Sequence, residues 1–191
     1  MRIDRVLFVV LLSSIGFSSM AKDINGSFAV KGVGALSCND FIQAASADAP
    51  ILQQYAGYVS GYVSAYNELE NNTFDVLPWQ QLDSFMLLLL QGCKQTPDST
   101  VGGAVSRITR YFSPNSLHKN AEKVEIKGQE QAVYFYPIVV EQIKEALLEQ
   151  GYDGDDLWSA MYQFQQDKKL LGKHPFEQLI LMKLLYGEKT K

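Results

Sequence analysis

The hydrophobic positions of this chain follow helical spacing over most of its length. Beyond about residue 37, apolar residues recur at intervals of three and four, which is typical of helices with one buried face. Clusters of Pro, Gly and Asn interrupt the pattern and predict where the helices end. No strand-rich region stands out, so the pattern predicts an all-α protein, with one short extended piece at 123–127.

Four helices are predicted in the first half of this pattern. Ser37 can cap a helix that runs to about residue 47, and a long helix follows at about 51–70. Pro78 is expected to open a third helix, and Pro97 a fourth that ends near 112. The third helix contains Met-Leu-Leu-Leu-Leu at 86–90, the strongest apolar run outside the N-terminal segment, which we expect to be part of a core.

A change of composition separates this region from a second helical pattern. Ser, Asn, Lys and Glu dominate residues 113–131, which predicts a linker. Pro137 then begins an amphipathic helix with Val139, Ile143 and Leu147 on one face. Two further helices are expected, at about 155–168 and from Pro175 to about 187. The predicted organisation is a signal at 1–21, a helical domain at 32–112, a linker at 113–136 and a three-helix domain at 137–187.

The first 21 residues have the three parts of a secretory signal. Arg2 and Arg5 give a positive start, residues 6–15 form an apolar core, and Ser19-Met20-Ala21 supplies the small residues of a cleavage site. Such a core is shorter than the roughly 20 residues that a membrane-spanning helix needs. A buried helix or an uncleaved anchor is the alternative. The segment predicts export to the periplasm of a bacterium.

Charge and cysteine content agree with this prediction. Without the two bases and one acid of the signal, the chain keeps 15 Lys and Arg against 20 Asp and Glu, an excess of acids that argues against a nucleic-acid partner. The two cysteines, Cys38 and Cys93, are expected to form a disulfide, as an even pair does in an oxidising compartment. A metal-binding pair or a catalytic thiol is the alternative, although the spacing and the distant histidines fit neither well.

The C-terminal pattern resembles the peptidoglycan-binding-like domain, a three-helix module of cell-wall hydrolases and other envelope proteins. The likeness covers about 46 residues, from 140 to 185, and is carried by Val140, Ile143, Leu147, Gly151 and Tyr152, then Ala160, Phe164 and Gln165, then Leu170 or Leu171 with Gly172, and finally Leu184 and Leu185. The resemblance implies a three-helix fold that contacts the wall. Its expected wall-binding residues are Tyr152, Asp153, Asp155 and Gln165, and a scaffold without wall binding is the alternative.

The first helical region resembles the Rap/Tai type of immunity protein, which neutralises cell-wall amidases injected by type VI secretion. The likeness, over about 32–110, is carried by Gly34-Ala35-Leu36-Ser37-Cys38, Phe41 and Ala44, by Gly57-Tyr58 and Gly61-Tyr62-Val63-Ser64-Ala65-Tyr66-Asn67, and by Cys93-Lys94, Pro97, Thr100 and Ala104-Val105. The resemblance implies a partner-binding protein. The expected partner-binding residues are Tyr58, Tyr62, Tyr66 and Asn67, although core packing would also explain the tyrosines.

The sequence carries no specific signature of catalysis. No Gly-x-Ser-x-Gly elbow occurs, and His118 and His174 each stand alone in the sequence. The acidic residues of the loop at 153–156 lack the pattern of a calcium-binding EF-hand and are expected to be solvated. We therefore expect a periplasmic, non-catalytic protein without cofactor or metal, which binds peptidoglycan or, alternatively, a cell-wall-active protein. Its oligomeric state is left open, and a lytic enzyme is the third possibility.

Overall fold

The structure is a computed structural model that describes residues 28–128, 131–153 and 156–187. The chain divides into two units, Met1–Val30 and Lys31–Lys191. Of the first unit, the described part is 28–30, so the predicted signal and its cleavage site lie outside the described residues.

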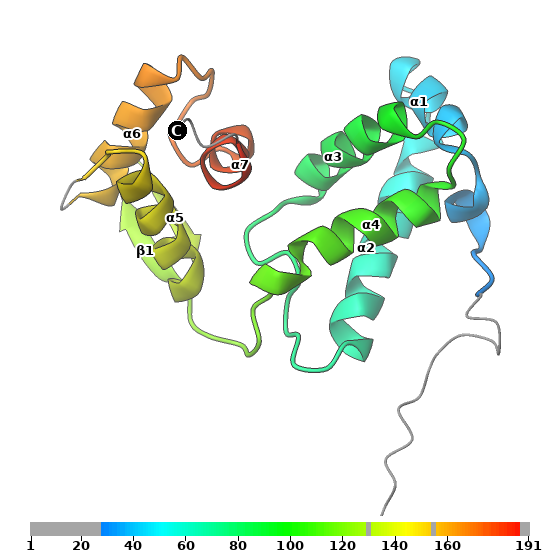
Figure 1. The fold of residues 1–191 in the computed structure, drawn as a ribbon, viewed down its shortest axis with the longest axis horizontal. Helices are drawn as coiled ribbons and strands as arrows, with labels where there is room; N and C mark the ends of the chain where they lie inside the picture. Colours follow the sequence, from blue (N-terminus) through cyan, green and yellow to red (C-terminus); the bar gives the residue numbers. More distant parts are fainter. Residues whose placement is uncertain (1–27, 129–130, 154–155, 188–191) are drawn as a thin grey trace, which may run out of the picture. The chain divides into compact units, whose positions relative to one another are not determined.

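The second unit is mostly helical, as the sequence predicts (Figure 1). In the described residues it contains α1 (Cys38–Ser46), α2 (Leu52–Leu69), α3 (Leu82–Gln95), α4 (Val101–Phe112), α5 (Pro137–Glu149), α6 (Leu157–Asp167) and α7 (Gln178–Tyr186). The helices α1–α4 pack against one another, and α5 packs against both α6 and α7. Among the helices described, none is long and apolar enough to cross a membrane.

A small sheet corrects the expectation of an all-α class. The strands β1 (Val124–Lys127) and β2 (Ala132–Phe135) pair antiparallel, with Glu125 opposite Tyr134. Ile126 and Phe135 are buried while Glu125 and Tyr134 are exposed, which is the two-residue alternation of strands with one face on a core. The extended piece expected at 123–127 is confirmed as β1, whereas β2 was not anticipated, because the alternation of a four-residue strand is too brief to stand out in the sequence.

Side-chain caps fix several helix starts. Ser37 and Asp40 form a reciprocal capping box at α1, where the Ser37 hydroxyl accepts from the Asp40 amide at 3.1 Å. The Thr100 hydroxyl accepts from the amide of Gly103 at α4. This cap explains why α4 starts at 101 and not at Pro97, so the expectation that Pro97 opens the helix is wrong.

The expected start of the third helix at Pro78 is also wrong, because tertiary hydrogen bonds hold the preceding segment outside the helix. Gln178, the first residue of α7, accepts from the Gln81 amide (2.8 Å) and the Ser84 hydroxyl (3.0 Å). Its Nε2 donates to the Trp79 carbonyl at 2.9 Å. One glutamine side chain therefore satisfies groups at the start of α3 that would otherwise need a local cap.

Two clusters of buried apolar residues form the interior. The first lies among the four helices α1–α4 and centres on Phe41, Tyr55, Phe85, Leu89 and Val105. The second, around α5–α7 and the two strands, centres on Ile143, Leu147, Met161, Phe164, Ile180 and Leu181. Trp79, which precedes α3, belongs to the second cluster and stacks on Tyr186 with ring centroids 5.9 Å apart.

Candidate functional site

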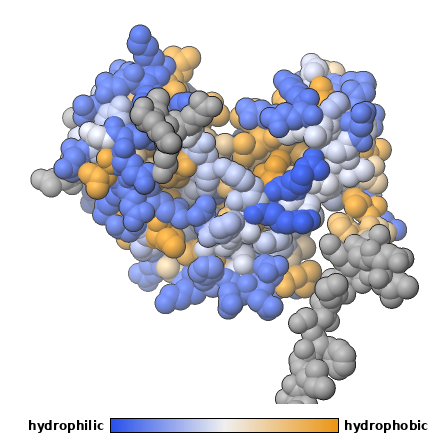
Figure 2. All heavy atoms as spheres, in the orientation of Figure 1, coloured by the Kyte–Doolittle hydropathy of each residue, from blue (hydrophilic) through white to orange (hydrophobic). Residues whose placement is uncertain are grey.

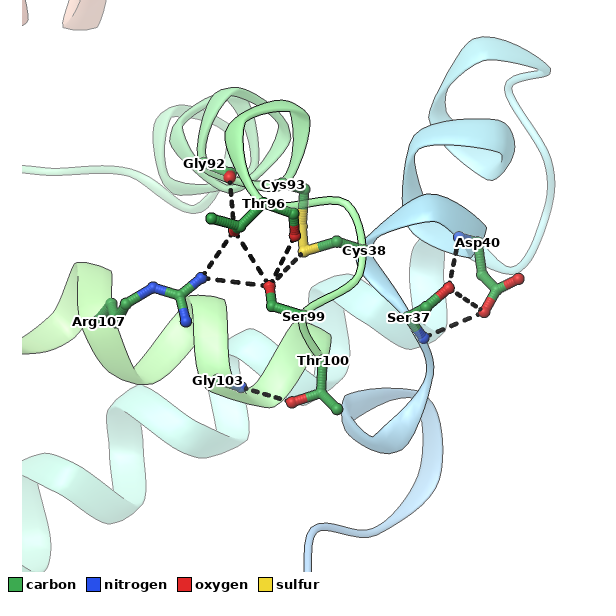
Figure 3. The surroundings of a disulfide bond; sticks show 10 residues. All are labelled: Ser37, Cys38, Asp40, Gly92, Cys93, Thr96, Ser99, Thr100, Gly103 and Arg107. Atoms are coloured by element: carbon green, nitrogen blue, oxygen red, sulfur yellow. Dashed lines mark hydrogen bonds between the residues drawn. A yellow bond between two sulfur atoms is a disulfide. The ribbon is translucent and has the colours of Figure 1, made fainter.

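The predicted disulfide between Cys38 and Cys93 is confirmed (Figure 3). Both cysteines are fully buried, and the bond joins the start of α1 to the last turn of α3. The Ser99 hydroxyl lies 3.5 Å from the Cys38 sulfur. Nη2 of Arg107 donates to the hydroxyls of Thr96 (3.0 Å) and Ser99 (3.3 Å), so the surroundings of the disulfide also orient this guanidinium. The bond is compatible with an extracellular or periplasmic location.

Three tyrosines of α2, Tyr55, Tyr58 and Tyr62, pack against the first core. Tyr55 is 1% exposed, and its ring meets that of Phe41 edge-on with centroids 4.9 Å apart. Tyr58, Tyr62 and Tyr66 are half-buried. Burial, and after it the neighbouring Tyr62, raises the pKa of the Tyr58 phenol. These contacts are those of core residues, and recognition through Tyr58, Tyr62 and Tyr66 stays a prediction.

Asn67, at the end of α2, has its side chain engaged within the fold. Its Oδ1 accepts from the Val76 amide at 2.9 Å, and its Nδ2 lies 3.4 Å from Oδ1 of Asp75. The residue thus holds the segment after α2 in place. In contrast, Gly57 and Gly61 lie on an exposed face, and no atom outside the helix would come within 4 Å of a Cβ at either position.

The predicted wall-binding residues are in different environments. Tyr152 is half-buried, its ring meets Phe164 edge-on at 5.6 Å, and burial raises the pKa of its phenol. Asp153 is exposed, whereas Asp155 lies outside the described residues. The structure therefore brings Tyr152 into packing contact with the core and leaves Asp153 in solvent.

Gln165, the fourth of these residues, is 4% exposed. Its Nε2 donates to the Gly172 carbonyl at 3.1 Å and lies 3.4 Å from the Leu170 carbonyl. The side chain therefore fixes the turn after α6, and its amide nitrogen is committed to the main chain.

A polar pocket with aromatic walls lies beside α6, and we call it the α6 pocket. Its volume is about 720 Å³, and its lining residues are Lys127, Gly128, Gln131, Asp156, Trp158, Ser159, Tyr162, Gln163 and Lys173. Tyr162 is 53% exposed, and Trp158 is half-buried between Gly128 and the ring of Phe176, whose centroid is 5.2 Å away. A side chain at Gly128 would collide with the indole, so glycine is needed there.

Asp156 lines the α6 pocket and also caps α6, the helix that forms a wall of this pocket. Its carboxylate accepts from the amides of Trp158 (3.2 Å) and Ser159 (3.1 Å) and from the Ser159 hydroxyl, and so caps α6. These hydrogen bonds, the one from the Ser159 hydroxyl first, lower the pKa of the Asp156 carboxyl. A charged acceptor is thus held at the pocket by the start of the helix.

Trp158 and Tyr162 were not among the residues that the sequence singled out. A usable signal exists, because residues four apart on a helix share one face and both of these are aromatic. Gln131 and Lys173 belong to other segments, and no local pattern connects them to α6.

A second candidate surface surrounds α3. Of the five residues in the run 86–90, Leu89 is fully buried, Met86, Leu88 and Leu90 are half-buried, and Leu87 is 47% exposed. The expected core run therefore places Leu89 in the core and packs Met86 and Leu90 against it, but leaves part of its apolar surface exposed. Figure 2 shows apolar residues gathered in the hollow over α3 and α4, with strongly polar residues beside them.

Leu87 forms a ridge between two hollows. On one side is a groove of about 660 Å³, which we call the α3 groove, lined by Leu87, Leu88, Gln91, Arg107, Ile108, Tyr111, Leu179, Met182, Lys183 and Tyr186, among others. On the other side is a hollow of about 500 Å³, lined by Phe41, Leu52, Met86, Leu87 and Leu90, among others. Burial, and after it the nearby Tyr111, raises the pKa of Tyr186 in the groove.

Comparisons with protein-family models, curated proteins and solved structures found no match for this chain. Within the described ranges, no three His, Cys, Asp and Glu side chains come together as a metal site would require. The two family resemblances therefore stay predictions, and the candidate sites are defined by their own geometry.

Proposed function

We propose that this chain is an exported, non-catalytic protein of the bacterial periplasm that associates with peptidoglycan through its C-terminal helices. The sequence supports this through its signal-like N-terminus and the resemblance of residues 140–185 to a wall-binding module. The observation that carries the proposal is the α6 pocket, where aromatic rings and hydrogen-bonding groups line one concave surface.

The chemistry of this pocket matches that of a glycan with attached peptides. The faces of sugar rings are apolar and pack on aromatic side chains such as Trp158 and Tyr162. Sugar hydroxyls and acetamido groups need both donors and acceptors, which the amides of Gln131 and Gln163 provide. The Lys173 ammonium suits the free carboxylates of the wall peptides.

Retention on purified, protein-free cell-wall sacculi tests the proposal. We expect the parent protein to co-sediment with sacculi and Tyr162→Ala to bind about tenfold more weakly, as loss of a central aromatic contact does. Tyr111→Ala is the matched control, since Tyr111 is similarly exposed but does not line the α6 pocket. Retention no greater than that of an unrelated protein, or equal retention of the two variants, would contradict the proposal.

Inhibition of a cell-wall-active protein is our second proposal, and the observation that favours it is the apolar surface around α3. Exposed contiguous apolar surface is typical of protein-binding sites. An assay of wall digestion by an amidase, with and without this protein, tests it. Protection that is lost in Leu87→Glu would support the proposal, and unaltered digestion by every amidase tested would contradict it.

A further inference from the structure

The fold leaves the apolar floor of the α3 groove uncovered. Leu87 on α3 keeps 47% of its surface exposed, while Tyr111 on α4 and Leu179 on α7 each keep 62%. These three large side chains come from three different helices and line the same groove. Because exposed apolar surface is costly in water, its collection in one place indicates a surface that a partner covers.

The charge of the groove differs in sign from that of the whole chain. The charged side chains that line it are Arg107 and Lys183, and none of its described lining residues is acidic. The chain as a whole has 17 Lys and Arg against 21 Asp and Glu. Nη2 of Arg107 is tied to Thr96 and Ser99, which holds the guanidinium in one orientation and leaves its other nitrogens to pair with an anion.

The walls of the groove are helices that are fixed to one another. Gln178 bonds the start of α7 to the segment that leads into α3, through three hydrogen bonds of 2.8–3.0 Å. Tyr186, near the end of α7, meets the ring of Phe112 on α4 edge-on with centroids 5.1 Å apart. A preformed groove of this kind loses little conformational entropy when a partner binds.

We propose, resting on the second proposed function, that the α3 groove binds an amphipathic helix of a partner protein whose apolar face is flanked by acidic side chains. A helix satisfies its own backbone hydrogen bonds, so it can fill a groove between helices while its apolar residues cover Leu87 and Leu179. Its flanking carboxylates would pair with Arg107 and Lys183, and this complementarity favours acidic over basic partners. A lipid acyl chain fits less well, because an open groove would leave one side of it in water.

A displayed library of helix-forming peptides tests this inference. Each peptide has about 15 residues, or roughly four turns, with an apolar face and flanking positions that vary among Glu, Gln and Lys. We expect selection on the parent protein to enrich Glu at the flanks. In solution, fluorescence anisotropy should show that Leu87→Glu weakens a selected peptide about tenfold or more. Lys183→Gln should weaken the Glu peptide more than its Gln analogue.

Controls separate this result from loss of folding and from wall binding. Leu148→Glu changes a leucine of α5 that is 62% exposed but does not line the groove, and should leave peptide affinity unchanged. Leu179→Glu tests the opposite wall if Leu87→Glu folds poorly. Enrichment of Lys, no enrichment, unaltered binding by both groove variants, or binding to phosphatidylglycerol vesicles but to no peptide would overturn the inference. Retention on sacculi tests wall binding through the α6 pocket, so failure of that proposal and failure of this inference can be told apart.

Discussion

The helices α1–α4 and the helices α5–α7 enclose cores of different kinds. The first core contains the Cys38–Cys93 bond, whereas the second depends on packing between side chains from three helices and two strands. The first exposes Leu87 in the α3 groove, which it shares with α7, and the second presents the more polar α6 pocket. A covalent link adds stability to α1–α4, whereas α5–α7 and the two strands depend on apolar burial alone.

Among the changes predicted here, loss of the disulfide should lower the stability of the protein most, and should affect α1–α4 more than α5–α7. Cys38→Ser should lower the free energy of unfolding by about 4 kcal/mol, because the bond closes a loop across 55 residues of sequence separation. Denaturant unfolding measures the loss. Hydrogen exchange should show amide protection falling more in α1–α4 than in α5–α7.

Reductant provides the control for this prediction. It should destabilise the parent protein by a similar amount and have little effect on Cys38→Ser, which lacks the bond. Equal stability of parent and variant would show that the disulfide is not structural. An equal loss of protection in both groups of helices would show that they unfold as one unit, and the comparison would then fail.

Ile143→Ala tests the core that has no covalent link. Ile143 is fully buried on α5, so its truncation should cost about 3 kcal/mol through lost burial and the cavity left behind. Ile138→Ala is the matched control, since Ile138 belongs to the same helix but is 41% exposed. Thermal unfolding of both variants, with and without reductant, measures the effect. A smaller loss for Ile143→Ala than for Ile138→Ala would disprove this assignment of the core.

Gln178→Ala should cost less, about 1–2 kcal/mol, because it removes hydrogen bonds at a half-buried side chain. The change leaves the Gln81 amide and the Ser84 hydroxyl without this partner, so α7 should be held less firmly against α3. Peptide affinity at the α3 groove should fall with it. Gln166→Ala, at an exposed position of α6, is the control. Parent-like stability and parent-like peptide affinity would show that this glutamine does not hold the groove.

Local features of this fold could be predicted from the sequence. The sequence predicts the Ser37 cap and the extents of α1, α2 and α5, because a cap or a helical face depends on residues close together in sequence. It also predicts the disulfide, because the chain contains one pair of cysteines. The starts of α3, α4 and α7 were misplaced, the last at Pro175 instead of Gln178. Pro78 and Pro97 are compatible with a first helical turn, but the actual starts depend on Gln178 and Thr100.

The surfaces were harder to predict than the helices. Hydropathy alone cannot tell that Leu87 stays exposed beside the buried Leu89, because the amount of core available depends on how α1, α2 and α4 pack. The α3 groove also joins residues about 90 positions apart, such as Leu87 and Leu179. Gln165 showed the converse: a polar residue that the family resemblance marks for binding is buried and holds a turn.

Asp156 offers the mildest test of how the α6 pocket is held. Asp156→Ala should cost about 1 kcal/mol by removing the cap of α6, whereas Asp153→Ala, at an exposed position, should cost little. Since the fold lowers the pKa of Asp156, its contribution is present at pH above the ordinary value of about 4 and is lost as the pH falls through the lowered one. The difference in stability between parent and Asp156→Ala should therefore narrow as the pH is lowered below about 4, and a difference that does not change with pH would show that charge is not what makes this cap effective.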